Sequence, residues 1–196
     1  GDWFNTGDMG RMDEDGFLWL TGRRKELIIR GGHNIDPAAI EEPLYKLKGV
    51  KTAAAVGRPD AHAGEVPVAY VELAEQSSLT RDEIMEWARE NIGEKAAVPK
   101  EVFIVDRIPL TAVGKIFKPA LRWDAAEKVY RHELEALGGM VEEAAVKVGE
   151  DKVHGTKAFI RVKPARGVTA ETIRNRVAEI LARYTVYYDV IVESDE

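Results

Sequence analysis

The sequence of 196 residues contains no cysteine. It can therefore form neither a disulfide framework nor a site that depends on a thiolate. Its four histidines are scattered, without the spacing that metal ligands show: His33, His62, His132 and His154. It also has no run of about 18 apolar residues, so we expect no transmembrane segment. These absences are compatible with the reducing cytoplasm, which is the location we expect.

Positive charge is not in excess either. Lysine and arginine number 28 against 34 aspartate and glutamate residues, which gives a net charge of −6. A nucleic-acid partner requires a basic face, so we expect none. Hydrophobic residues make up 45% and charged residues 32%, as in ordinary globular proteins with one large or two small domains.

The N-terminal region has the pattern of a domain interior. The first residues, GDWFNTGD, include no Met. They also lack the charged segment followed by an apolar segment that a targeting sequence contains. We therefore expect the sequence to be part of a longer protein. Short apolar stretches alternate with turns over residues 9–30, and Asp15-Gly16 is a typical hairpin turn.

A strand, a Gly-Gly break and a helix are predicted next, in LIIRGGHNIDPAAIEEPLYKL. Asp36 can cap this helix, and Pro37 suits its first turn because no intrahelical N–H is missed there. The predicted buried face carries three aliphatic residues: Ile40, Leu44 and Leu47. Strands are expected at residues 52–57 and 66–73, on either side of GRPDAHAGE.

A capping box predicts the start of the next helix, where Thr80 is followed by Glu83 three positions later. Its buried stripe is expected to comprise Ile84, Ala88 and Ile92, with Trp87 beside it. A third strand is predicted for EVFIV, residues 101–105. A charged amphipathic helix is predicted from Pro119 to Leu137, ended by Gly138-Gly139.

The C-terminal part repeats this pattern at a constant offset of 89 residues. Thr80 aligns with Thr169 and Ile84 with Ile173, and DVIVE repeats EVFIV after a slip of one residue. KTAAAV and EEAAVKV each supply a strand before the repeated segment. A shared architecture explains the match as well as a duplication does.

Four short motifs follow one another along the chain: NTGD (5–8), TGRRKELI (21–28), RGGHNI (30–35) and LTAVGKIFK (110–118). Each motif alone is weak, since Thr-Gly-Asp and Gly-Gly are common in turns and Gly-Lys is common in exposed loops. Together, in this order and at these separations, they are specific.

In this combination the sequence resembles the C-terminal part of the adenylate-forming enzymes: acyl-CoA synthetases, the adenylation domains of nonribosomal peptide synthesis, and firefly luciferase. The resemblance covers residues 1 to about 125 and is closest to fatty-acyl-CoA synthetases. It implies an AMP-forming ligase in which a C-terminal lid swings between two half-reactions. The first joins a carboxylic acid to ATP, and the second transfers the acyl group to CoA.

The resemblance also implies roles for individual residues. Asp8 matches the aspartate that holds the ribose hydroxyls of ATP, and Arg23 matches an arginine that also reaches the ribose. For Arg23 the alternative is a structural ion pair. Lys25 falls at the hinge of the lid, and Gly31 and Gly32 match the loop that lines the pantetheine tunnel of CoA.

Lys115 matches the lysine that reaches the substrate carboxylate and the α-phosphate during adenylation, so the resemblance implies that it is catalytic. A cation preorganised in a dry site stabilises developing negative charge far better than one in water. His33 stands where relatives often carry Glu, and we assign it no role.

The resemblance up to about residue 125 and the repeated pattern after it together predict an α+β fold with three parts. Residues 1–22 are the end of the N-terminal adenylation domain, 23–125 form the lid with a small mixed β-sheet, and 126–196 form a second ββαβ-like unit. The phosphate-binding loop, the glutamate that binds Mg²⁺ and the acyl pocket are expected upstream. The chain alone is therefore expected to be inactive and to need its own N-terminal adenylation domain as a partner.

Two alternatives stay open. A nonribosomal-peptide-type adenylation domain would normally be followed by a carrier domain with a reactive serine, but the only serine after residue 100 is Ser194. CoA is therefore the favoured acceptor. Residues 126–196 could instead form a non-catalytic binding module or mediate homo-oligomerisation, because they carry apolar strand patterns without a chemical motif.

Overall fold

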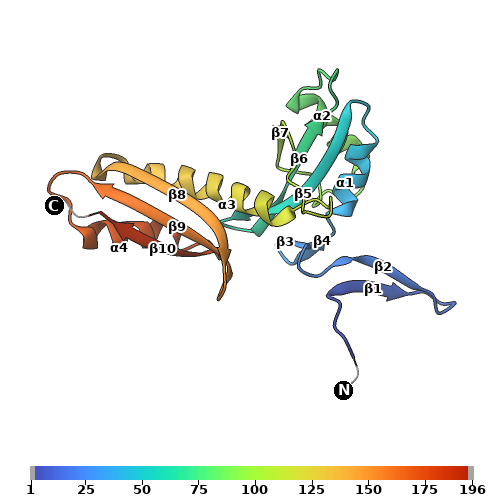
Figure 1. Cartoon of the computed structure of the whole chain (residues 1–196), viewed down its shortest axis with the longest axis horizontal. Coiled ribbons are helices and arrows are strands. Elements are labelled where there is room, and N and C mark those ends of the chain that lie inside the picture. The colour runs from blue at the N-terminus through green and yellow to red at the C-terminus, as the bar shows by residue number, and fades with distance from the viewer. Residues whose placement is uncertain (1–2, 194–196) are drawn as a thin grey trace. The chain divides into compact units, whose positions relative to one another are not determined.

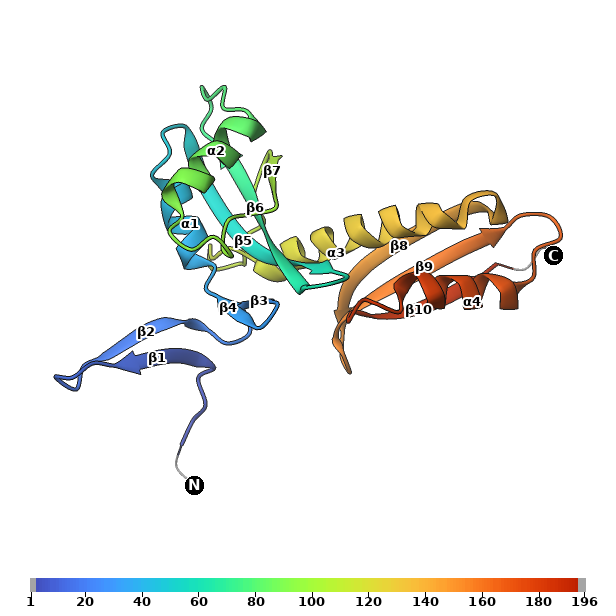
Figure 2. The same cartoon turned by 180° about the vertical axis from the view of Figure 1, so that it is seen from behind.

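The computed structural model describes residues 3–193 (Figures 1 and 2). In chain order the elements are β1 (Asp8–Met12), β2 (Leu18–Arg23), β3 (Ile28–Arg30), β4 (His33–Ile35), α1 (Ala38–Tyr45), β5 (Val50–Asp60), β6 (Gly64–Leu73), α2 (Arg81–Asn91), β7 (Glu101–Val105), α3 (Lys118–Leu134), the 3₁₀ helix η1 (Glu135–Met140), β8 (Val141–Asp151), β9 (Gly155–Pro164), α4 (Ala170–Leu181) and β10 (Tyr187–Val192). The described strands form sheets that contain both antiparallel and parallel pairs, so the predicted α+β class is confirmed.

Packing divides the chain into two compact units. Unit 1 comprises the chain up to Gly57 together with Glu65–Lys118, and unit 2 comprises Arg58–Gly64 together with the chain from Pro119 onward. Each unit has a hydrophobic core of its own. This division concerns packing within the chain, so the domain boundaries predicted after residues 22 and 125 stay predictions.

The predicted N-terminal hairpin is present, formed by the antiparallel strands β1 and β2. Its turn is organised by the carboxylate of Asp13, which accepts the indole N–H of Trp19 at 2.6 Å and the backbone N–H of Phe17 at 2.8 Å. These bonds, that from Trp19 first, lower the pKa of Asp13. Gly16 has a φ of +85°, which glycine adopts without steric cost.

In unit 1 the helices α1 and α2 pack on a sheet ordered β4-β3-β6-β5, with β7 beside β6. The carboxylate of Asp36 accepts the N–H of Ala38 at 2.9 Å at the start of α1, as predicted for a cap. Ile40 and Leu44 are fully buried, whereas Leu47 lies beyond the end of α1 and is half-buried. The runs of consecutive buried residues in β5 and β6 are typical of strands covered on both faces.

The predicted capping box of α2 is confirmed. The Thr80 hydroxyl accepts the N–H of Glu83 at 3.3 Å, and the Glu83 carboxylate accepts the N–H of Thr80 at 2.8 Å. The predicted stripe is buried in the core of unit 1: Ile84, Ala88 and Ile92. Trp87 is half-buried beside it and donates its indole N–H to the carbonyl of Pro43 at 2.9 Å.

Unit 2 contains a three-stranded sheet ordered β10-β9-β8, with α3 and α4 packed against it. β8 and β9 pair antiparallel. β9 and β10, which the helix α4 connects in the chain, pair parallel. The expected ββαβ unit is therefore present. Side chains that alternate with the core residues of β9 and β10 are exposed, among them Phe159, Tyr187 and Ile191.

The end of α3 differs from the prediction. The α-helix stops at Leu134 and the chain continues as the 3₁₀ helix η1. Within η1, Gly138 takes φ +50° and ψ −132°, a conformation that non-glycine residues rarely adopt. Leu137 is buried in the core of unit 2, so the tighter last turn still contributes to packing.

The predicted repeat is confirmed as a shared topology, since β5-β6-α2-β7 and β8-β9-α4-β10 follow the same order. Thr169 caps α4 and accepts the N–H of Thr172 at 3.2 Å. However, the β9 residue Lys157 lies opposite Tyr187 in β10. The last strand is therefore displaced further than the one-residue slip that the sequence suggested. Duplication and a shared architecture both stay open as explanations.

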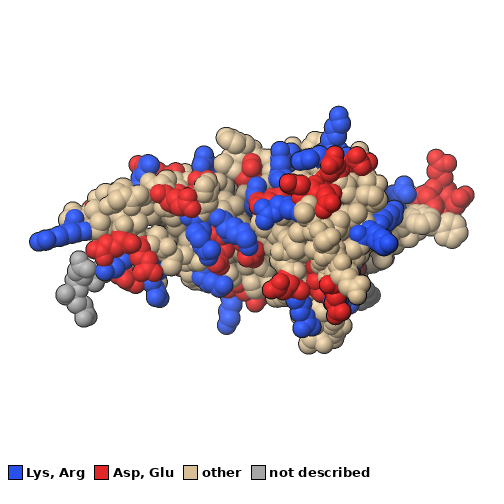
Figure 3. Space-filling view, turned by 90° about the horizontal axis from the view of Figure 1, so that it is seen from above, with Lys and Arg blue, Asp and Glu red and all other residues tan. Residues whose placement is uncertain are grey.

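Acidic and basic side chains are interspersed over the surface that Figure 3 displays. Many acidic and basic side chains of the described residues form ion pairs within a unit, such as Arg183 with Glu133 at 2.6 Å and Lys157 with Asp189 at 2.6 Å. Among the described residues, no helix has both the length and the apolar character needed to cross a membrane.

Candidate functional site

Lys115 lies near the tip of a short loop between β7 and α3. Leu110 and Ile116 pair as an isolated antiparallel bridge, so the loop has the form of a small hairpin. Thr111 closes it from within, because its hydroxyl accepts the N–H of Lys115 at 3.1 Å and its own N–H donates to the Lys115 carbonyl at 2.7 Å. Gly114, with a φ of +78°, makes the turn.

The side chain of Lys115, by contrast, is exposed. Across residues 3–193, no hydrogen bond or ion pair holds its ammonium group. The backbone of the loop is therefore ordered while the charge that it carries stays available. This geometry is compatible with the predicted role of Lys115, and it is also that of an ordinary surface lysine.

The N-terminal end of the Lys115 loop is fixed by a buried carboxylate. Glu72 in β6 is only 8% exposed, and it accepts the N–H of the buried Ile108 at 2.9 Å. Lys51 in β5 donates to the other oxygen of the same carboxylate, with its Nζ 2.6 Å from Glu72 Oε1. The bond from Lys51, followed by that from Ile108, lowers the pKa of Glu72, so the carboxylate is held in its charged form.

The C-terminal end of the loop is fixed by Lys118, the first residue of α3. Its Nζ lies 3.1 Å from Glu26 Oε2 and 3.0 Å from Glu41 Oε1. The Lys118 side chain is only 14% exposed, so it is largely removed from water. Glu41 Oε1 also accepts the N–H of Ala55 at 2.7 Å, which joins this cluster to β5.

The sequence analysis did not single out Lys118, Glu26, Glu41 or Glu72. One signal was present for Lys118, because a cation at the N-terminus of a helix is opposed by the helix dipole. The first turn of α3 has no acidic residue of its own to compensate. A lysine in that position therefore requires carboxylates from elsewhere in the fold.

Asp8 and Arg23, the two residues predicted to reach the ribose, are brought together. They lie directly opposite each other in the register of β1 and β2, and Arg23 Nε is 3.2 Å from Asp8 Oδ1. Both side chains remain accessible, at 32% exposed for Asp8 and 62% for Arg23. The ion pair is also the structural alternative that the sequence left open for Arg23, and the two roles are compatible.

Lys25, the predicted hinge residue, lies in the turn that joins β2 to β3. The N–H of Glu26 donates to the carbonyl of Arg23 at 2.9 Å and closes this turn. Lys25 itself is exposed. Its place between two strands is suited to a change in backbone torsion angles, because no helix or ladder would have to break at that residue.

Gly31 and Gly32 form the two-residue turn between β3 and β4, where Arg30 pairs with His33. Their φ angles are +54° and +87°, both in the region that favours glycine. A Cβ added at either position would meet no atom within 4 Å. Backbone conformation alone therefore accounts for both glycines in this structure, and the predicted role beside CoA remains a prediction.

The β3–β4 hairpin is attached to the segment after α2. Arg30 Nη1 donates to the carbonyl of Ala96 at 2.6 Å, and His33 Nδ1 lies 3.7 Å from Glu94 Oε1. His33 and Glu94 are both exposed, so the interaction is weak. His33 therefore has a local partner but no evident chemical role.

Apart from Lys25 at the predicted hinge, the predicted site residues lie in three parts of unit 1. Asp8 and Arg23 belong to the β1–β2 hairpin, the glycine pair belongs to the β3–β4 hairpin, and Lys115 belongs to the loop before α3. Among the described residues, no hydrogen bond or ion pair joins Lys115 to Asp8 or Arg23.

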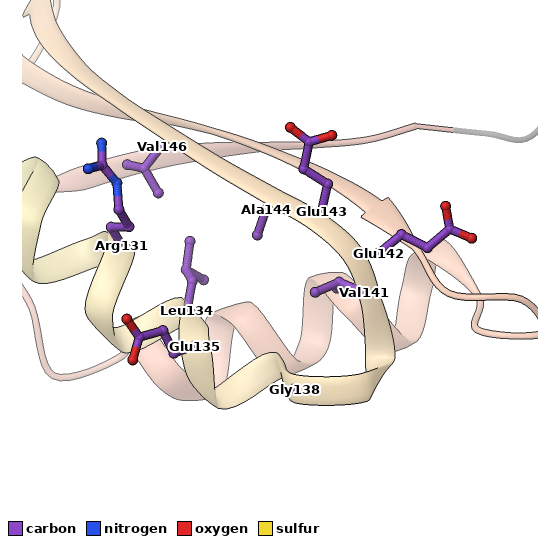
Figure 4. A pocket seen from close by; sticks show the side chains of 9 residues that line it. All are labelled: Arg131, Leu134, Glu135, Gly138, Val141, Glu142, Glu143, Ala144 and Val146. Carbon is purple, nitrogen blue, oxygen red and sulfur yellow. The ribbon is translucent and has the colours of Figure 1, made fainter.

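A pocket of about 360 Å³ lies elsewhere, in unit 2 between α3, η1 and β8 (Figure 4). Aliphatic side chains point into it from both sides, including Leu134 and Val146, while the carboxylates of Glu142 and Glu143 point away. Two of its charged residues are already paired, Arg131 with Glu127 and Glu142 with Lys163. None of the predicted site residues lines this pocket.

Residues 39–115 match the family model described as the AMP-binding enzyme C-terminal domain, and this match includes Lys115. Residues 39–115 therefore carry the C-terminal domain of the AMP-binding enzymes. The predicted family is confirmed.

Within this class, the curated relatives that the chain matches include CoA ligases. It is 52% identical over 135 residues to marinolic acid–CoA ligase of Pseudoalteromonas sp. (strain SANK 73390), covering 69% of this chain and 21% of that protein. It is 41% identical over 131 residues to indoleacetate–CoA ligase of Aromatoleum aromaticum, covering 67% of this chain and 26% of that protein. The chain thus spans about a quarter or less of these relatives.

Solved structures give the same result. ATP-bound MatB from Rhodopseudomonas palustris matches with a TM-score of 0.56 and 34% identity, over 61% of this chain and 24% of that one. The o-succinylbenzoate CoA synthetase from Bacillus subtilis, in complex with its acyl-adenylate intermediate, matches with a TM-score of 0.56 and 36% identity, over 61% and 24%.

Proposed function

We propose that this chain is the C-terminal lid of a longer AMP-forming ligase that joins a carboxylic acid to CoA. Its match to only 21–26% of the length of CoA ligases supports a separate N-terminal adenylation domain as its partner. In the first half-reaction the carboxylate attacks the α-phosphate of ATP, and pyrophosphate leaves. In the second, the CoA thiol attacks the acyl carbon, and AMP leaves with the bonding electron pair.

Lys115 is the residue that carries this proposal. Negative charge gathers on the carboxylate and the α-phosphate as the first bond forms, and a preorganised cation lowers the energy of that state. The ammonium of Lys115 is exposed on an ordered loop, with no partner among the described residues. It can therefore enter an active site on another domain without first breaking an ion pair.

Asp8 and Arg23 are proposed to contact the ribose of ATP. A carboxylate can accept hydrogen bonds from both hydroxyls of a vicinal diol. Arg23 binds one oxygen of Asp8 and so orients the carboxylate, while both side chains remain accessible. The carboxylate of Asp8, as an acceptor, and the guanidinium of Arg23, as a donor, therefore fit a sugar diol.

The remaining roles concern the second half-reaction. Gly31 and Gly32 are proposed to line the passage for the pantetheine arm of CoA, and Lys25 is proposed to lie at the hinge between the two conformations. Mg²⁺ is proposed to bind the N-terminal domain together with ATP. Among residues 3–193, no group of three or more His, Asp or Glu side chains is arranged to hold a metal ion.

The acid is proposed to be a fatty or related carboxylic acid. A fatty acyl CoA synthetase from Mycobacterium tuberculosis supports this class, with a TM-score of 0.53 and 35% identity over 64% of this chain and 25% of that one. Indoleacetate–CoA ligase and feruloyl-CoA synthase are also relatives, so a panel of acids is the appropriate test. The cytoplasmic location stays a prediction.

The test compares Lys115→Ala with the unchanged sequence in the ligase that contains this chain. We expect carboxylate-dependent ATP–pyrophosphate exchange to fall by about a hundredfold to a thousandfold. Formation of the thioester from supplied acyl-adenylate and CoA should change much less, because the bond between the carboxylate and the α-phosphate is already made in the supplied acyl-adenylate, so the step that Lys115 is proposed to assist is bypassed.

Lys100→Ala is a suitable control, since Lys100 is another exposed lysine of unit 1 and lies outside the proposed site. It should leave both half-reactions unchanged. An equal loss in both half-reactions with Lys115→Ala would contradict the role given to this lysine. Absence of exchange with every acid in the unchanged ligase would contradict the proposed function itself.

A second proposal concerns unit 2, which carries none of the predicted catalytic residues. Phe159, Tyr187 and Ile191 are 42%, 57% and 57% exposed on one side of its sheet. These exposed apolar side chains, which lie beside the ion pair of Lys157 with Asp189, support self-association of the chain. Sedimentation velocity of the unsubstituted chain and of the double variant Tyr187→Glu/Ile191→Glu tests this proposal. If the unsubstituted chain is a monomer at every concentration, self-association is ruled out.

A further inference from the structure

Both ends of the Lys115 loop are held by buried or nearly buried charge. Glu72 and Lys51 secure Ile108 before the loop, and Lys118 closes it three residues after Lys115. Between these points, the hydrogen bonds of Thr111 determine the path of the backbone. A catalytic cation must be placed to within a fraction of an ångström, so the anchors of such a loop affect the rate.

Lys118 is the anchor nearest to Lys115. Its ammonium lies between the carboxylates of Glu26 and Glu41 at 3.1 and 3.0 Å. With a side chain only 14% exposed, it is screened by water far less than a surface ion pair. Two carboxylates around one ammonium also offset its desolvation, which a single partner often does not.

The two partners of Lys118 belong to different parts of unit 1. Glu41 is in α1 and also binds the N–H of Ala55 in β5, so this contact ties Lys118 to the body of the unit. Glu26 follows the predicted hinge residue Lys25 and precedes β3. Lys118 therefore connects the Lys115 loop both to the sheet and to the hinge segment.

We propose that Lys118 is a positioning residue that fixes Lys115 for the adenylation step. This inference rests on the proposed function of Lys115. Lys118 acts through the backbone of residues 115–118 and through its two carboxylates, without touching the substrate. Arginine could replace it in this role, because a guanidinium can bind two carboxylates, whereas a neutral side chain of similar length could not.

The kinetic test uses the ligase that contains this chain with Lys118→Met and Lys118→Arg. We expect Lys118→Met to lower the rate constant of carboxylate-dependent ATP–pyrophosphate exchange by about tenfold or more, with thioester formation from acyl-adenylate nearly unchanged. Lys118→Arg should recover most of the loss. Lys128→Met, at an ion-paired lysine in the same helix, is the matched control and should leave both steps unchanged.

A double variant shows whether Lys118 acts through Lys115. If it does, adding Lys118→Met to Lys115→Ala should produce no further loss in exchange, so the two effects should be strongly non-additive. Two results would overturn the proposal: a double variant whose loss equals the product of the two single losses, or an equal loss of both half-reactions with Lys118→Met. Either would mean that Lys118 contributes only to the general stability of the fold.

An activity-independent measurement separates this inference from the proposed function. Hydrogen exchange of the 196-residue chain should show faster exchange of the Lys115 N–H, which is bonded to Thr111 Oγ1, in Lys118→Met than in Lys118→Arg. Unchanged exchange over residues 109–117 would overturn the anchoring role even in an active enzyme. Faster exchange in a ligase without the expected activity would uphold the anchoring and reject the function.

Discussion

Among single residues, Glu72 shows how strongly a carboxylate depends on its donors once it leaves water. It is 8% exposed and accepts bonds from the ammonium of Lys51 and the backbone N–H of Ile108. Because these donors favour the charged form, the pKa of Glu72 is lower in the folded protein than its ordinary value of 4.5. Its ionisation therefore stabilises the fold above the ordinary pKa, and this contribution is lost as the pH falls through the lowered pKa.

Glu72→Gln should test this linkage. The amide oxygen of glutamine can still accept the N–H of Ile108, but the charge that faces Lys51 is gone. We expect the variant to lose about 1.5–3 kcal/mol in the free energy of unfolding at neutral pH. The difference from the unchanged chain should narrow as the pH falls below the ordinary value of 4.5 and through the lowered pKa of Glu72. Urea denaturation at pH 7 and pH 3.5 measures both, and a difference that stays constant with pH would contradict this account.

The residues that carry motifs could be predicted from the sequence, whereas those that hold them in place could not. Lys115 and Asp8 stand in short, recognisable segments. Glu72 meets Ile108, and Lys118 meets Glu26, only because distant parts of the chain fold together. The place of Lys118 at the start of a helix indicates that it needs carboxylate partners, but the sequence does not show which glutamates supply them, so the pairs could be identified only in three dimensions.

At the scale of elements, the glycines of the β3–β4 hairpin have two possible explanations. Their positive φ angles, +54° for Gly31 and +87° for Gly32, already account for glycine structurally. A passage for CoA would impose an additional requirement for an open space, which a side chain would fill. The two requirements can be distinguished, because asparagine tolerates positive φ but still carries a side chain.

Gly31→Asn is the variant that distinguishes them. We expect the melting temperature of the chain to change little, because the turn favours asparagine at such a position. If the glycine pair lines the passage for CoA, thioester formation in the longer ligase should fall by about tenfold, while ATP–pyrophosphate exchange stays unchanged. If Gly31→Asn leaves both half-reactions at the rates of the unchanged ligase, the backbone angle alone explains the glycine at position 31.

Elements with local signals were predicted well, and those that depend on packing were not. The capping box at Thr80 and the hairpin turn at Gly16 are present because their hydrogen bonds and torsion angles involve only neighbouring residues. The end of α3 was placed too late, since Leu137 reaches the core from a 3₁₀ turn. The register of β10 was also missed, because pairing with β9 is decided by the whole of unit 2.

For the whole molecule, the main physical feature is the presence of two cores. Ile84 in α2 and Ile173 in α4 occupy equivalent places in the repeated topology, and each is fully buried. No residue belongs to both core clusters as they are described. Burial of an isoleucine stabilises the residues that pack around it, so each core should mainly stabilise its own unit.

Ile84→Ala and Ile173→Ala should therefore have separate effects. Each variant should lose about 2–5 kcal/mol of local stability, because a cavity replaces a packed side chain. Hydrogen exchange should quicken over β6 and α2 in the first variant, and over β9 and α4 in the second. Ile104→Ala and Ile191→Ala are matched controls, since these isoleucines are 40% and 57% exposed, and both should have small effects. Faster exchange throughout the chain in either core variant would mean that the two units unfold as one. In that case a defect in unit 2 would reach the Lys115 loop through stability alone, even though unit 2 carries none of the predicted catalytic residues.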